Sequence, residues 1–156
     1  MMRIVSSLLL ATLLGLGTAQ AQVGGTEIVL YRFAGVRDDG GGIGMGVATV
    51  FHCTNFSGVT ETIRFVLRDF DATLISNRTV NIAHLRTIAV STHDDVAYAH
   101  TDFLSSATPI MEGSLAIAAT TTSIVCTAMT IDASNPVPVG VSLHGVRFSP
   151  IPGTEE

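Results

Sequence analysis

Hydrophobic and polar side chains alternate with a period of two along much of the chain. The clearest case is residues 61–70, where Ile63, Phe65 and Leu67 alternate with a set that is polar or charged except for Val66, namely Thr62, Arg64, Val66 and Arg68. Because successive side chains of a strand point to opposite faces, this alternation predicts a half-buried antiparallel strand. Beyond the N-terminal apolar run, no segment has helical periodicity over three turns.

Shorter runs rich in Thr, Val, Ile and Phe, bounded by Gly, Asn, Asp and Pro, predict further strands. They cover residues 27–34, 47–54, 73–75, 79–83, 86–91, 110–119, 123–131 and 140–148. No stretch is left for the crossover helices that a parallel sheet needs. We therefore expect an all-β fold, a single antiparallel β-sandwich of about seven to nine strands.

Residues 1–21 predict a secretory signal peptide. Arg3 precedes an apolar run over residues 4–17, which is followed by Ala19-Gln20-Ala21, a small-x-small cleavage site. The run is shorter than the roughly 20 residues that a membrane-spanning helix needs. We expect cleavage near Ala21 and a β-sandwich domain over residues 22–156. The mature chain would then lack a membrane span and lie in the periplasm or outside the cell.

Cys53 and Cys126 are the only cysteines, and each lies inside a predicted strand. An even number of cysteines in an exported chain favours a disulfide, and there is no CxxC motif to indicate a redox or metal pair. One cysteine lies in an early strand and the other in the penultimate strand. This placement resembles immunoglobulin-like domains of exported bacterial proteins, which implies an inter-sheet disulfide. The chain departs from that family in having no Trp, and Ile124 replaces the usual Tyr.

Composition narrows the classes of function. All eight basic residues are Arg, and 13 acidic residues bring the formal net charge to −5. Without Lys, a Walker-type phosphate loop and Schiff-base chemistry are excluded. The negative charge and the absence of basic runs argue against nucleic acid as a partner. The absence of Trp disfavours a platform for stacking sugars, and the Lys-free, Arg- and Ala-rich usage indicates a bacterial source.

Motifs that would indicate a catalytic or cofactor site are incomplete. The Gly-rich residues 38–46 lack the GxGxxG spacing and open no helix, although Asp38 and Asp39 could offer oxygens to a hard cation. Residues 140–144 lack the final Gly of a nucleophile elbow. Residues 126–129 lack the nearby His of a blue-copper site. We therefore expect no enzyme active site.

Residues 91–102 are the richest in potential metal ligands, with two His and three Asp. His93, Asp95, His100 and Asp102 combine imidazole and carboxylate groups, which suit zinc or another first-row divalent metal. The two histidines are too far apart in sequence for the tight spacing of common metal motifs. A solvated polar loop is the alternative interpretation of this segment.

These observations favour a secreted or periplasmic, non-catalytic module with a structural or protein-interaction role and no cofactor. Its low-charge, Thr-rich surface would also suit self-association through strand edges. The alternative is a metal- or small-ligand-binding periplasmic protein that uses the loop from His93 to Asp102 and holds a divalent metal there.

Overall fold

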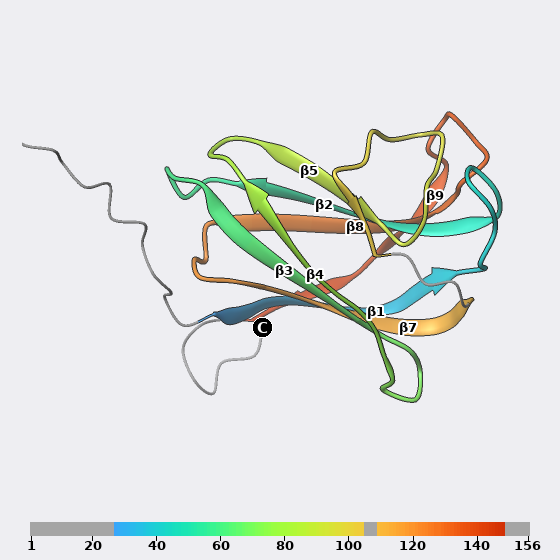
Figure 1. Cartoon of the computed structure of the whole chain (residues 1–156), viewed down its shortest axis with the longest axis horizontal. Helices are drawn as coiled ribbons and strands as arrows, with labels where there is room; N and C mark the ends of the chain where they lie inside the picture. The colour runs from blue at the N-terminus through green and yellow to red at the C-terminus, as the bar shows by residue number, and fades with distance from the viewer. Residues whose placement is uncertain (1–26, 105–108, 149–156) are drawn as a thin grey trace, which may run out of the picture.

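The computed structural model describes residues 27–104 and 109–148, which form β-strands and no helix. The strands are β1 (Ile28–Asp38), β2 (Val47–Asn55), β3 (Glu61–Arg68), β4 (Leu74–Ile82), β5 (Thr87–Ser91), β6 (Asp102–Phe103), β7 (Ile110–Ala119), β8 (Ile124–Asp132), β9 (Gly140–Leu143) and β10 (Gly145–Arg147). They form two five-stranded sheets, sheet A in the order β10-β1-β7-β3-β4 and sheet B in the order β6-β5-β2-β8-β9. Figure 1 shows β2, β5 and β8 in an upper layer and β1 and β7 in a lower one.

A single large hydrophobic cluster takes side chains from both sheets. Sheet A contributes Phe33 and Phe65, and sheet B contributes Phe51 and Val90, all of them buried. The rings of Phe33 and Phe51 meet edge to face, with centroids 5.5 Å apart. Removing this much apolar surface from water is the main force that holds the two sheets together.

Alternation along the chain gives the inward face of each strand correctly. In β3 the residues expected to point inward, Ile63, Phe65 and Leu67, are all fully buried. Each of these three residues pairs in antiparallel register with a residue of β7 on one side and a residue of β4 on the other. Pairing is antiparallel throughout the described residues except between β5 and the two-residue β6.

The predicted disulfide between Cys53 and Cys126 is present, but it does not join the two sheets. The cysteines lie on β2 and β8, which are neighbours in sheet B, and the register places them directly opposite each other with Cα atoms 4.2 Å apart. Both face the hydrophobic cluster. The inter-sheet prediction was wrong because it took the bridge from immunoglobulin-like domains, whereas here the two cysteine strands pair with each other.

The C-terminal strand also differs from the prediction. Residues 140–148 form two strands, β9 beside β8 in sheet B and β10 beside β1 in sheet A. The chain passes from one sheet to the other at His144. The next residue, Gly145, lies against the Phe33 ring, and a residue with a Cβ could not take this position because the Cβ would overlap the ring. Conversely, the expected pieces at 73–75 and 79–83 are parts of the continuous strand β4. The described residues therefore contain ten strands, where seven to nine were expected.

The predicted signal peptide, residues 1–21, lies outside the described residues. Within residues 27–104 and 109–148, no helix is long and apolar enough to span a membrane. The disulfide fits a protein of the periplasm or the extracellular space, because thiols are kept reduced in the cytosol.

Loss of the disulfide should destabilise the fold. The double substitution Cys53→Ala/Cys126→Ala removes a bond that closes a loop over a sequence separation of 73 residues. We expect the free energy of unfolding to fall by about 2–4 kcal/mol, measured by urea denaturation. A reductant should lower the midpoint of the unsubstituted protein and leave the double variant unchanged. Equal stability of the two oxidised proteins would contradict a stabilising role.

Candidate functional site

Three loops from distant parts of the chain meet at one end of the two sheets. They are residues 39–46 between β1 and β2, residues 92–101 between β5 and β6, and residues 133–139 between β8 and β9. Figure 1 shows them together at the upper right, in cyan, yellow and orange. We call this region the loop end.

Backbone hydrogen bonds join the three loops to one another. Gly44 N–H donates to the Asp94 carbonyl over 3.0 Å, and Val96 N–H donates to the Ala133 carbonyl over 3.0 Å. Ala133 N–H in turn donates to the Gly46 carbonyl over 2.7 Å. Each loop is therefore bonded to both of the others, which limits the freedom of all three.

The four predicted metal ligands do not converge on one point. His100 Nε2 lies 2.6 Å from Asp95 Oδ2, with both side chains buried. His93 Nδ1 instead lies 3.0 Å from Oδ1 of Asp38, at the end of β1. Asp102 Oδ1 accepts a hydrogen bond from the N–H of the next residue. The structure thus brings together two of the four residues and separates the other two.

The His93 side chain links two loops to the end of β1. Its Nε2–H donates to the Met45 carbonyl over 2.9 Å, and its Nδ1 faces the fully buried carboxylate of Asp38. Asp38 Oδ1 also accepts from Gly40 N–H over 2.7 Å. The sequence offered Asp38 as a cation ligand, but its contacts hold the 39–46 loop in place.

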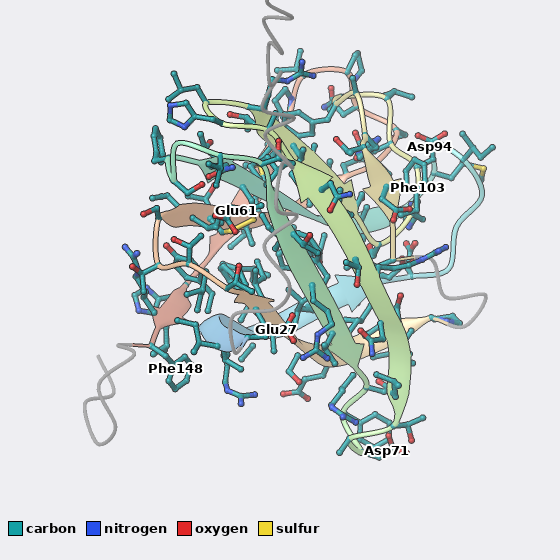
Figure 2. The ribbon with its side chains drawn as sticks, turned by 60° about the vertical axis from the view of Figure 1, so that its left-hand side comes forward. Glu27, Glu61, Asp71, Asp94, Phe103 and Phe148 are labelled. Carbon is teal, nitrogen blue, oxygen red and sulfur yellow. A yellow bond between two sulfur atoms is a disulfide. The ribbon has the colours of Figure 1, made fainter. Side chains whose placement is uncertain are left out.

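Asp95 organises the 92–101 loop from within. Its Oδ1 accepts hydrogen bonds from the N–H groups of Ala97 and Tyr98, at 2.9 and 3.0 Å, while Oδ2 faces His100. The other ring nitrogen of His100 lies 3.7 Å from Asp94 Oδ1. Figure 2 shows Asp94 close to Phe103, whose ring centroid is 5.0 Å from that of His100.

The same loop covers the part of the outer face of sheet B that lies nearest the loop end. A second hydrophobic cluster lies there, made of Ala48, Val50, Ala89, Ile131 and Ala133, with Ala97, Tyr98 and Met129 packed against it. The Tyr98 hydroxyl donates to Met129 Sδ over 3.3 Å. The loop is a packed part of the fold, which explains why the side chains of His93, Asp95 and His100 are largely buried, whereas the Asp94 side chain is 40% exposed.

This geometry bears on the metal hypothesis. Within the part of the chain that the structure describes, no group of three or more His, Cys, Asp or Glu side chains is placed to hold a metal ion. Each His–Asp pair supplies two ligands, whereas protein zinc sites use three or four. Asp38 Oδ2, His93 Nδ1, Asp95 Oδ2 and His100 Nε2 nevertheless lack an aligned hydrogen bond. The metal site stays a prediction, and the contacts favour a structural role for both pairs.

His52 lies beneath the loop, on β2. Its ring meets the Tyr98 ring edge to face, with centroids 4.6 Å apart. Burial lowers the pKa of His52 below its ordinary value, the nearby His100 lowers it further, and Asp95 opposes the shift. The neutral imidazole is therefore the form that this part of the fold prefers.

The loop end exposes apolar side chains from all three loops. They are Ile43, Met45, Val96, Val137 and Val139, each between 51% and 81% exposed. Sequence reasoning missed this surface because the residues are isolated within Gly- and Pro-rich segments. The available signal was the presence of large apolar side chains in loops whose other residues are small or polar.

Comparison with known proteins shows no family for this chain. No protein-family model matches it, and no curated protein is similar to it. A solved structure, the crystal structure of Thermotoga maritima 1070, is similar with a TM-score of 0.44 and 11% sequence identity. The similarity covers 76% of this chain and 91% of that one.

The depressed pKa of His52 makes stability depend on pH. The unfolded chain takes up a proton on this histidine near its ordinary pKa of about 6.5, while the folded protein does so only at lower pH. The stabilisation from neutral His52 is thus complete above pH 6.5 and is lost as pH falls toward the folded pKa. His52→Gln should reduce the loss of unfolding free energy on acidification, measured by urea denaturation at several pH values.

The control is His84→Gln, which changes an exposed histidine at the opposite end of the sheets and should leave the loss of unfolding free energy on acidification unchanged. Identical pH profiles for His52→Gln and the unsubstituted protein would refute this assignment.

Removing the His93 side chain should destabilise the protein. His93→Ala leaves the buried Asp38 carboxylate without its facing partner, so we expect the free energy of unfolding to fall by about 1–3 kcal/mol. In the background of Asp38→Asn, the same substitution should cost less, and a double-mutant cycle measures the difference. Stoichiometric zinc in natively purified protein, lost on His93→Ala, would contradict the structural role.

Proposed function

We propose that this protein is a secreted or periplasmic, non-catalytic β-sandwich module that binds another protein through its loop end. The observation that carries the proposal is the set of exposed apolar side chains on three loops that are bonded to one another. Clustered exposed apolar residues on otherwise polar loops are typical of protein-interaction surfaces.

Preorganisation supports this function. Ordering flexible loops opposes binding, and loops that are already fixed avoid much of that cost. Here the backbone bonds, the His93–Asp38 contact and the His100–Asp95 contact fix the loops before any partner arrives. The proposed binding surface resembles that of immunoglobulin-like domains, in which loops at one end of two packed sheets contact the partner.

The placement of the titratable groups supports a non-catalytic role. A catalytic acid or base must reach the proton of a bound substrate. His100 and Asp95 are buried and face each other, and the Asp38 carboxylate is buried beside His93. These groups are engaged in holding the loops, so the interaction role accounts for them without a reaction.

A second copy of this chain is the alternative partner. Strands β4 and β10 are the edges of sheet A, and β6 and β9 are the edges of sheet B. The edge strand β9 follows the 133–139 loop directly and carries Val141, an exposed apolar residue. Self-association through β9 would therefore involve residues beside the loop end.

Site-specific photo-cross-linking in the native host tests the proposal. A photoreactive amino acid at Ile43 of the full chain should give a discrete adduct with another protein. The control position is Phe70, which is 77% exposed, in the turn that contains Asp71 at the bottom of Figure 2. That position should give no such adduct. An adduct of twice the chain's mass would replace the partner with a second copy. No adduct at Ile43, or the same adduct at both positions, would sink the proposal.

A further inference from the structure

Sheet A carries a hollow of about 450 Å³. Most of its lining positions on β1, β3 and β7, such as Arg32, Val66 and Ser114, alternate with the buried residues of those strands, so it opens on the face turned away from the core. The buried residues Phe33 and Leu115 also border it. A volume of this size falls within the range of roughly 300–1,000 Å³ that small-molecule sites occupy. Phe148 lines one side of it and lies far from Asp94 in Figure 2, so the hollow is separate from the loop end.

Short side chains at adjacent positions make the floor of the hollow. On β7, Ala116 pairs with Arg32 of β1, and Ser114 pairs with Ala34 of β1. On its other side, Ser114 pairs with Arg68 of β3. Cross-strand neighbours lie about 5 Å apart, so Ala34, Ser114 and Ala116 form a continuous low area between longer side chains.

The two arginines stand at opposite corners of this floor. They lie on strands separated by β7 and are offset by two residues along it, which places their Cα atoms roughly 12 Å apart. His144 lies at the point where the chain passes between the sheets, and it lines the hollow as well. The Arg68 guanidinium donates to the Ala72 carbonyl over 2.9 Å, so a ligand shared with Arg32 would be held by its remaining N–H groups or in exchange for that bond.

Positive charge in the hollow is not balanced by carboxylates. The lining includes Arg32, Arg68 and His144 but no Asp or Glu. Within residues 27–104 and 109–148, the arginine ion pair is Arg64 with Glu27, so neither lining arginine is paired with an acid. A second hollow, whose lining includes Asp69 and Glu112, shares Ala34 and Ser114 with the first. A site with this charge balance suits an anion in a protein that is otherwise acidic.

Apolar side chains line the hollow beside the two arginines. Val66 and Val146 line the hollow together with Phe148, and the Arg32 guanidinium lies 5.4 Å from the centroid of the Phe148 ring. A guanidinium stacked on an aromatic ring keeps its N–H edge free to bind an anionic oxygen. The hollow therefore offers guanidinium groups for a charged part of a ligand and apolar side chains for its uncharged body.

We propose that this hollow binds a small organic carboxylate, with its carboxylate held by Arg32 and Arg68 and its apolar body against Phe148 and Val66. Guanidinium groups match carboxylates in geometry and bind them by charge-assisted hydrogen bonds. The floor of Ala34, Ser114 and Ala116 leaves room for the body of the ligand. This site is independent of the loop end and of its proposed partner.

Titration of the full chain with benzoate, followed by amide NMR, tests the site. Benzoate should shift the amide signals of Arg32, Ser114 and Ala116 and saturate, whereas benzyl alcohol, its uncharged counterpart, should not. Arg32→Gln and Arg68→Gln should each weaken benzoate binding about ten-fold. The matched control, Arg78→Gln, changes an exposed arginine of β4 outside the hollow and should leave the affinity unchanged.

Two further measurements keep the proposal falsifiable. Ser114→Leu fills the floor at an exposed position without removing charge, and it should abolish binding while the protein stays folded. Inorganic phosphate should bind more weakly than benzoate, because it has no apolar body. Equal affinity for phosphate would overturn the apolar half of the proposal. Benzoate binding that neither arginine substitution nor Ser114→Leu alters would overturn all of it.

Discussion

The antiparallel pairing of β2 with β8 is the constraint on which the rest of the structure depends. It runs without a bulge from Val47 opposite Asp132 to Asn55 opposite Ile124, and Cys53–Cys126 fixes its register covalently. Because β2 begins where β8 ends, the loop that leads into β2 and the loop that leaves β8 emerge side by side. The loop end exists because of this register, and a shift by one residue would turn every inward side chain of one strand outward.

Sheet B is covered on its inner face and on the part of its outer face near the loop end, which accounts for the burial of polar groups in a chain of few charges. Its inner face packs on sheet A, and its outer face lies under the 92–101 loop. A loop in that position must bury some of its own polar groups, and an isolated buried carboxylate is unfavourable. Asp38 and Asp95 each face a histidine, so each carboxylate has a partner supplied from within the fold. Of the charges that the sequence concentrates in two loops, Asp38 and Asp95 are therefore used inside the molecule, whereas Asp39 and Asp94 are accessible to solvent.

Period-two alternation predicted the strand class, most strand positions and the inward direction of residues such as Phe65. The even cysteine count and the predicted export indicated that the cysteines would bond, but the prediction placed them in different sheets, because alternation fixes the face of a side chain and not the neighbour of its strand. Asp95 and His100 belong to the same short loop, so a local sequence pattern could suggest that they lie close together. The pairing of His93 with Asp38 depends on the topology of β1 and β5, which no local pattern contains. The hollow on sheet A likewise requires the register of several strands at once.

The passage of the chain from β9 to β10 places a short strand, rather than a long one, at one edge of each sheet. β9 lies along β8 in sheet B, and β10 lies along Tyr31, Arg32 and Phe33 of β1 in sheet A. Without this segment, two long strands would present unpaired N–H and C=O groups, and such edges are templates for intermolecular β-pairing. Residues 140–148 thus cover the long strands β1 and β8, and leave the short strands β9 and β10 as the edges on that side.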